Sequence, residues 1–144
     1  MQNISSQNRI LVVDDNQDAA EMLQVLLQLE GYEVRLAFSG ESALSEAVDF
    51  RPFVTCSDLS MPGMSGFELA TALKESVHSS DTHLIAMTGL STDENLRDVK
   101  QVGFDACFIK PFNFEEFIAH VHSVFAKASF LALWTSMTQH PLVK

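Results

Sequence analysis

Apolar residues along this chain fall into five short runs, separated by longer segments in which apolar residues recur every three or four positions. The runs have the length of β-strands, and the longer segments have the spacing of amphipathic helices. The first, fourth and fifth runs are almost continuously apolar, which is typical of strands covered on both faces. The second run alternates and is predicted to be an edge strand. The expected strands are Arg9–Val13, Glu33–Ala37, Phe53–Ser57, His83–Met87 and Ala106–Ile109.

Signals for helix ends delimit the segments between the strands. Gly31 is placed to end the first helix, and Ser39 is a candidate N-cap for the second. Ser91 and Glu94 have the spacing of a capping box ahead of the fourth helix, and Asn113 is expected to start the fifth. The apolar positions of the five expected helices lie within residues 19–26, 43–48, 67–77, 96–99 and 117–125.

The strict alternation of strands and helices predicts an α/β fold, with a doubly wound five-stranded parallel sheet and helices on both faces. In such sheets ligands bind at the carboxyl ends of the strands. At 144 residues the chain fits one domain, which we expect to span residues 9–128 after a lead of residues 1–8. Residues 129–144 are expected to extend the last helix or to dock on a partner, and the alternative is a partly disordered tail.

The charge of the chain excludes some partners. Its formal net charge is −10, from 19 acidic and 9 basic residues, and it has no basic stripe that would attract a phosphate backbone. We therefore expect no nucleic-acid partner. Because no apolar run approaches the roughly 20 residues that span a bilayer, and the N-terminus lacks a signal-peptide pattern, we expect a cytoplasmic protein without membrane contact.

Two cysteines, Cys56 and Cys107, each lie inside an apolar strand. Their spacing matches neither a zinc site nor a CxxC redox motif. We expect two buried, reduced thiols.

Polar residues that could carry chemistry stand at the ends of four of the five strands. Carboxylates that meet at one place repel each other unless a cation joins them, and Mg²⁺ prefers a few carboxylate oxygens together with phosphate. A lysine ammonium and a threonine hydroxyl can contact phosphate oxygens, and a carboxylate can accept a phosphoryl group covalently. The residues at these strand ends are Asp14, Asp15, Asp58, Thr88 and Lys110.

Four motifs at these positions resemble those of response-regulator receiver domains of the CheY-like superfamily. They occur in order between about Arg9 and Ala126, and the resemblance implies a flavodoxin-like sheet in the order 2-1-3-4-5. That order separates the third and fifth strands by one strand, so the two cysteines should lie about 10 Å apart, too far for a disulfide. The motifs are LVVDD (11–15), SDLSMPGMSG (57–66), AMTG (86–89) and KPF (110–112).

The resemblance implies a role for each residue of the acidic group. Asp58 corresponds to the phosphorylated aspartate. Asp15 corresponds to the acid that binds the metal directly, and Asp14 to the acid that acts through metal-bound water. Ser60 corresponds to the residue whose backbone carbonyl binds the metal.

The resemblance also implies that Thr88 is the conformational-switch hydroxyl and that Lys110 binds the phosphate, before what is typically a cis peptide to Pro111. The chain departs from the family pattern at Cys107, where members usually carry an aromatic residue that turns inward with the hydroxyl. A thiol is too small to follow Thr88 as a ring would. The departure puts the family's usual output route in doubt but not phosphorylation.

Our leading hypothesis is therefore a Mg²⁺-dependent phosphoacceptor of a two-component phosphorelay. It would receive its phosphoryl group from a histidine kinase or a histidine phosphotransfer protein and signal through contact with an unidentified downstream protein. It could act alone, as a homodimer, or as the receiver portion of a hybrid kinase.

Two alternatives come from other classes. A pseudo-receiver scaffold without phosphorylation is favoured by Cys107 and opposed by the complete acidic set with its lysine. A flavodoxin-like or phosphatase-type enzyme is disfavoured, because aspartyl phosphatases usually carry a second acid two residues after the nucleophile, where this chain has Ser60. We therefore expect no turnover of an external substrate.

Overall fold

The computed structural model describes residues 8–89 and 93–138. Residues up to Phe112 form one compact unit, and those from Asn113 onward form a second. The strands are β1 (Arg9–Val13), β2 (Glu33–Ala37), β3 (Val54–Asp58), β4 (His83–Thr88) and β5 (Ala106–Ile109). The helices are α1 (Gln17–Leu29), α2 (Gly40–Phe50), α3 (Gly66–Glu75), α4 (Asp93–Gln101) and α5 (Phe114–Thr138).

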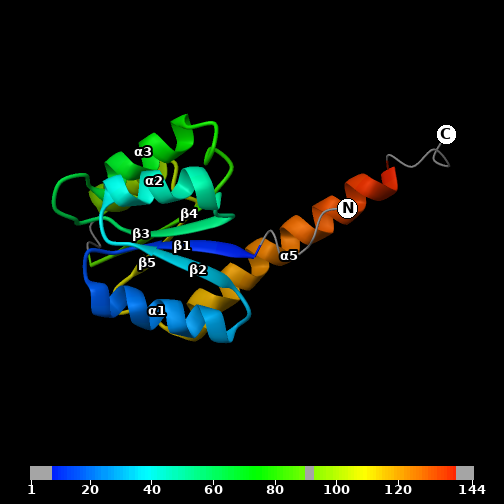
Figure 1. The fold of residues 1–144 in the computed structure, drawn as a ribbon, viewed down its shortest axis with the longest axis horizontal. Helices are drawn as coiled ribbons and strands as arrows, with labels where there is room; N and C mark the ends of the chain where they lie inside the picture. The colour runs from blue at the N-terminus through cyan, green and yellow to red at the C-terminus, as the bar shows by residue number, and fades with distance from the viewer. Residues whose placement is uncertain (1–7, 90–92, 139–144) are drawn as a thin grey trace. The chain divides into compact units, whose positions relative to one another are not determined.

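The five strands form one parallel sheet in the order β2-β1-β3-β4-β5, which confirms the predicted fold class and strand order (Figure 1). In Figure 1, α1 lies on one face of this sheet, and α2 and α3 lie on the other. Parallel neighbours require crossover connections, and the helices supply them. All five strands therefore end at the same edge of the sheet.

Three strands have the expected bounds, whereas β3 and β4 each end one residue later than predicted. The ladder continues because Asp58 of β3 pairs with Met87 of β4, and Thr88 of β4 pairs with Ile109 of β5. β3 also begins at Val54 rather than Phe53. Asp58 and Thr88 are thus the last residues of their strands, which fixes their backbones in the ladder.

The outermost strands of the sheet are β2, as predicted, and β5. The expectation that the fifth strand is covered on both faces was wrong. Residues Ala106 to Phe108 are only partly buried and Ile109 is exposed. An apolar run of four residues is too short to distinguish a central strand from an edge strand by periodicity.

The core of the first unit follows the alternation of side chains along β1. Leu11 and Val13 belong to a buried cluster with residues of α2 and α3, including Ala47 and Leu69. Ile10 points to the opposite face and is also fully buried. The continuous apolar run at residues 10–13 is therefore explained by burial on both faces.

Side-chain caps fix where α2 and α3 begin. Ser39 accepts a hydrogen bond from the backbone of Ser42 in the first turn of α2, which confirms the predicted N-cap. The Ser65 side chain accepts from the Glu68 backbone, and the Glu68 carboxylate accepts from the Ser65 backbone. The Ser65–Glu68 pair is a capping box that the sequence analysis missed, although its spacing was readable. The predicted capping box at Ser91 lies outside the described residues.

The second unit contains α5, a helix of 25 residues. Its start is confirmed, because the Asn113 carboxamide oxygen accepts from the Glu116 backbone at 3.1 Å. The buried residues of α5, all in its first half, are Phe117, Val121 and Phe125. The second half continues as helix through Thr138, and its large apolar side chains are exposed: Phe130, Leu131, Leu133, Trp134 and Met137.

By length and composition alone, α5 is apolar enough to cross a membrane, a test that core helices of soluble proteins also pass. The sequence analysis considered continuous apolar runs, and none in α5 approaches 20 residues. Small and hydroxyl-bearing residues interrupt the apolar ones in α5, so no continuous apolar run appears in the sequence. Few charges interrupt them, so the average over the helix is still apolar.

Both cysteines are free thiols, as predicted, but only one of them is fully buried, whereas burial was expected for both. Cys56 on β3 is fully buried, and Cys107 on β5 is partly buried. Strand β4 lies between them. Burial raises the pKa of both thiols, which keeps them protonated and unreactive near neutral pH.

Candidate functional site

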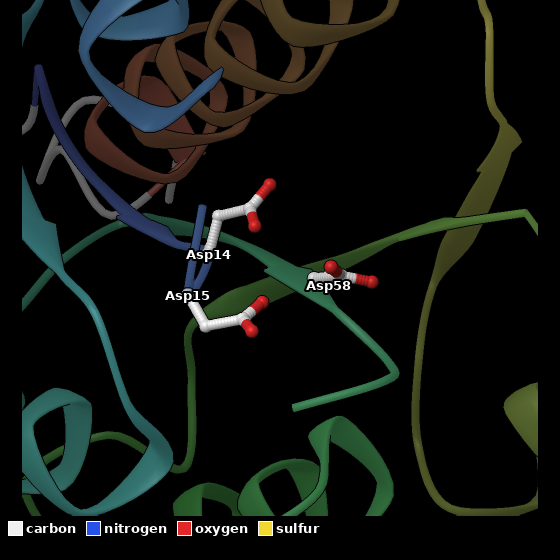
Figure 2. A group of neighbouring side chains, drawn as sticks. All are labelled: Asp14, Asp15 and Asp58. Atoms are coloured by element: carbon white, nitrogen blue, oxygen red, sulfur yellow. The ribbon is translucent and has the colours of Figure 1, made fainter. Parts of the chain in front are cut away.

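Three carboxylates meet at the carboxyl edge of the sheet, although they come from segments more than 40 residues apart. Asp14 and Asp15 follow β1, and Asp58 ends β3, as Figure 2 shows. One oxygen of each carboxylate lies within 4.8 Å of an oxygen of each of the other two. The convergence predicted for these acids is therefore observed.

Lys110 forms ion pairs with two of these acids. Its Nζ lies 3.2 Å from Asp14 Oδ2 and 3.5 Å from Asp58 Oδ2. The side chain of Asp14 is 4% exposed and that of Asp58 is 15% exposed, whereas that of Lys110 is 35% exposed, so the acids are the more shielded partners in both contacts. Lys110 follows β5 directly and precedes Pro111 through a cis peptide bond. The sequence therefore places an ammonium where the two acids converge.

The electrostatic environment of Asp58 disfavours its ionised form. Burial raises the pKa of the Asp58 carboxyl above its ordinary value, and the negative charge of Asp14 raises it further. Lys110 and the Ser60 backbone N–H act in the opposite direction, but the pKa of Asp58 remains raised. One ammonium does not balance three carboxylates. The net negative charge and the oxygen donors fit a hard divalent cation such as Mg²⁺.

The loop after β1 holds Asp14 in place. Asp14 Oδ1 accepts a hydrogen bond from the Asn16 backbone at 3.0 Å, and Asn16 in turn caps α1 by accepting from Ala19. The sequence analysis missed Asn16 as a positioning residue. Its signal was a short amide side chain directly before an amphipathic segment, which is a typical N-cap.

The loop after β3 is held close to Asp58 by a glycine. A Cβ atom on Gly66 would clash with the Asp58 carbonyl oxygen and would lie 2.7 Å from Leu59 Cα. The Ser60 backbone N–H donates to Asp58 Oδ1 at 3.3 Å. Because Gly66 has no side chain, it can pack directly against Asp58 and Leu59, next to the Ser60 backbone that contacts the Asp58 carboxylate.

Thr88 and Cys107 lie on neighbouring strands, β4 and β5. Thr88 is buried at the end of β4, and its carbonyl accepts from the Lys110 backbone at 2.7 Å. Cys107 pairs with Ala86 and packs against the hydrophobic core. Cys107 thus lies on the fifth strand, as predicted, whereas Thr88 is the last residue of its strand rather than the first residue after it.

This arrangement suits phosphoryl transfer. The carboxylates can hold a divalent cation, and the cation and Lys110 together can neutralise the oxygens of a phosphoryl group. Asp58 presents a carboxylate oxygen at the same place. The chemistry of the donor set therefore agrees with a metal-assisted phosphoacceptor.

Comparisons with known proteins assign this geometry to a family. A family model described as the response regulator receiver domain matches residues 10–122. The chain is 35% identical over 115 residues to the phosphate regulon transcriptional regulatory protein PhoB of Pseudomonas aeruginosa, a match that covers 80% of this chain and 50% of PhoB. The chain spans about half the length of the curated relatives it matches.

Solved structures agree with the sequence matches. The chemotaxis response regulator CheY4 of Vibrio cholerae has a TM-score of 0.75 and 34% identity, with 81% of this chain and 97% of CheY4 covered. The response regulator TrrA of Thermotoga maritima, solved in complex with Mg²⁺ and BeF, has a TM-score of 0.71 and 34% identity. That match also covers 81% of this chain and 97% of TrrA.

Proposed function

This chain belongs to the response-regulator receiver family, and from that premise we propose that it is a phosphoacceptor switch of a two-component phosphorelay. Asp58 would accept the phosphoryl group in a Mg²⁺-dependent reaction. The observation that carries the proposal is the meeting of three carboxylates with the Lys110 ammonium at the carboxyl edge of the sheet.

Asp15, Asp14, Asp58 and the Ser60 carbonyl are the groups we propose to hold Mg²⁺, directly or through water. When bound, Mg²⁺ supplies positive charge that lowers the repulsion between the acids and the incoming phosphoryl group. The TrrA structure, which contains Mg²⁺ and BeF, supports this choice of metal. The acidic set also fits it, since hard oxygen ligands at close range are what Mg²⁺ prefers.

In the proposed reaction an Asp58 carboxylate oxygen attacks phosphorus, and the bond between phosphorus and the donor atom breaks. The product is an acyl phosphate on Asp58, and the donor leaves with the electron pair of the broken bond. Lys110 holds a phosphate oxygen through its ammonium, and the Thr88 hydroxyl donates a hydrogen bond to another. Water attack on the acyl phosphate would reverse the switch, with no external substrate turned over.

The phosphorylated state would differ from the free state in a surface recognised by a downstream protein. The phosphoryl donor of this chain would be a histidine kinase or a histidine phosphotransfer protein in the cytoplasm. We propose the same receiver boundaries as the sequence analysis, residues 9–128. Several relatives of this chain are named as DNA-binding or transcriptional regulators, and they are about twice as long as the matched region.

The proposal is tested by incubating the chain with Mg²⁺ and a small phosphodonor such as acetyl phosphate. Intact-mass spectrometry should show the gain of one phosphoryl group that is stable in acid and labile in base. The gain should be lost when Mg²⁺ is chelated and in Asp58→Asn. A matched control is Asp98→Asn, which removes an exposed carboxylate from α4. Modification that persists in Asp58→Asn would contradict the assignment.

Cys107 supports a second candidate, a pseudo-receiver that acts as a scaffold without phosphorylation. Its thiol stands where the family usually has an aromatic ring, and it packs into the core. A scaffold would bind its partner equally well before and after treatment with the phosphodonor. Absence of the mass gain in the wild-type chain would favour the scaffold.

A further inference from the structure

A cleft lies where the strands of the sheet begin, opposite the edge that carries the acidic site. Its volume is about 220 Å³, and three separate segments form it. These are the start of β1, the connection from α2 to β3, and the connection from α3 to β4. The residues that the argument uses are Arg9, Arg51, Phe53, His78, Ser80 and Asp81.

Basic groups gather at this cleft although the chain as a whole is strongly acidic. Two of its four arginines, Arg9 and Arg51, line the cleft together with His78. Arg51 Nη2 lies 3.5 Å from His78 Nδ1. When Nδ1 accepts from the guanidinium, the hydrogen of the ring is on Nε2, which is then a donor. The cleft therefore offers donors from two guanidinium groups and an imidazole.

The orientation of Arg9 is fixed by the backbone around it. Its Nε donates to the Phe50 carbonyl at 2.7 Å, and its Nη2 donates to the Arg51 carbonyl at 3.2 Å. These bonds hold a positive charge at the cleft without neutralising it, because carbonyl oxygens carry no net charge. A preoriented guanidinium loses little conformational entropy when it binds an anion.

Arg51 adds an observation of a different kind. Its backbone has φ 50° and ψ 65°, the left-handed conformation that favours glycine or asparagine. Among the described residues it is the only one other than glycine with a positive φ. The fold thus carries a long cationic side chain at a position where glycine, which has no Cβ, would be less strained. Strained positions of this kind are often retained for function.

From the cleft, its donors and the strained arginine we infer a binding site for a small anion that carries a phosphate or carboxylate group. The planar guanidinium of Arg51 matches two oxygens of such a group, and Arg9 supplies a second charge. The Ser80 hydroxyl is a further donor, and Phe53 provides an apolar wall. Asp81 also lines the cleft and opposes the anion, which limits the affinity.

The site is tested by nuclear magnetic resonance of the ¹⁵N-labelled chain during titration with inorganic phosphate and, separately, with citrate. Mg²⁺ is omitted and the ionic strength is kept constant with chloride. We expect saturable shifts of the Phe53, Ser80 and Asp81 amides with at least one of the two anions. The titration shows which head group is preferred. Absence of saturable shifts at these amides with both anions would overturn the inference.

Variants separate this cleft from the carboxyl edge. Arg51→Gly removes the guanidinium and suits the left-handed backbone, so we expect a folded chain whose anion affinity is about tenfold weaker. Asp81→Asn should strengthen binding roughly threefold, because it removes the opposing charge. In Arg97→Gln, which removes an exposed guanidinium from α4, the affinity should be unchanged.

A further control addresses phosphate bound at the other edge. In Lys110→Ala the shifts at Ser80 and Asp81 should persist with the same midpoint. If they disappear in this variant, or if His78→Ala and Arg51→Gly both leave the affinity unchanged, the anion is not bound by the cleft and the inference is wrong.

Discussion

The two edges of this sheet collect opposite charges by the same topological rule. At the carboxyl edge, where the strands end, three carboxylates meet, and Lys110 contacts two of them. At the amino edge, where the strands begin, Arg9 of β1 and two residues of the connections, Arg51 and His78, line a cleft. A parallel sheet places all strand starts on one side and all strand ends on the other. Each edge can therefore assemble a site from residues far apart in the sequence.

The edges differ in how tightly the chain is packed around them. At the carboxyl edge Asp14 is buried, Asp58 is partly buried and Asp15 is exposed, and a glycine allows close backbone contact there. Arg51, His78 and Ser80 at the amino edge are exposed, and their cleft is open to solvent. Substitutions at the carboxyl edge should therefore have the larger effects on stability and chemistry.

The largest effect is expected for Gly66→Ala, because the added Cβ would clash with the Asp58 carbonyl oxygen and press on Leu59. We expect a loss of about 3 kcal/mol in the free energy of unfolding, measured by denaturant titration. Gly89→Ala is the matched control, since a Cβ at Gly89 meets nothing within 4 Å, and it should change stability by less than about 0.5 kcal/mol. Equal stability of the two variants would show that the carboxyl edge is not tightly packed.

Lys110→Ala should slow phosphorylation of Asp58 by roughly a hundredfold at saturating Mg²⁺, because it removes the protein's own cation from the phosphate position. The rate is measured by intact mass during incubation with acetyl phosphate. Lys100→Ala removes a charge from the exposed face of α4 and should leave the rate unchanged. A rate loss of less than about threefold in Lys110→Ala would mean that the metal alone carries the charge neutralisation.

Asp58→Asn should stabilise the metal-free chain by on the order of 1 kcal/mol near neutral pH, because it removes repulsion from Asp14 and the cost of burying a charge. The folded-state pKa of Asp58 is raised above its unfolded value, so the folded chain favours the protonated form. The wild type should therefore lose stability relative to Asp58→Asn as the pH rises through this raised pKa.

Thermal unfolding at several pH values measures this difference. The stabilities of the two proteins should converge in acid, below the ordinary pKa of an aspartate. Added Mg²⁺ should narrow the gap at neutral pH by stabilising the wild type. A gap that does not vary with pH would show that the ionised form of Asp58 is not disfavoured.

Much of the carboxyl edge was readable from sequence, for a physical reason. Strand ends lie at one edge whatever the helices do, so Asp14, Asp58 and Lys110 could be placed together from the strand assignments alone. The exact ends of β3 and β4 were harder to predict from the sequence. The ladder includes Asp58 and Thr88 because their backbones find partners on neighbouring strands, which no local pattern reveals.

The amino edge was not readable from the same pattern. Arg51 lies at the C-terminal end of α2, and His78 lies in the connection after α3, so neither directly precedes a strand. Their meeting depends on the paths of two connections, which carry no periodic signal. The left-handed backbone of Arg51 was equally hidden, since an arginine gives no indication of a positive φ.

The smallest effect, and the sharpest test of the amino edge, is on the strain at Arg51. Arg51→Gly should stabilise the fold by roughly 0.5 kcal/mol, because relief of the left-handed strain is partly offset by the greater freedom of glycine in the unfolded chain. Arg51→Ala loses the same guanidinium but keeps the strain, so it should be no more stable than the wild type. Chemical denaturation of the three proteins side by side measures the difference. If Arg51→Gly were less stable than Arg51→Ala, the left-handed backbone of Arg51 would not be strained. The strain would then no longer distinguish the amino edge from the carboxyl edge.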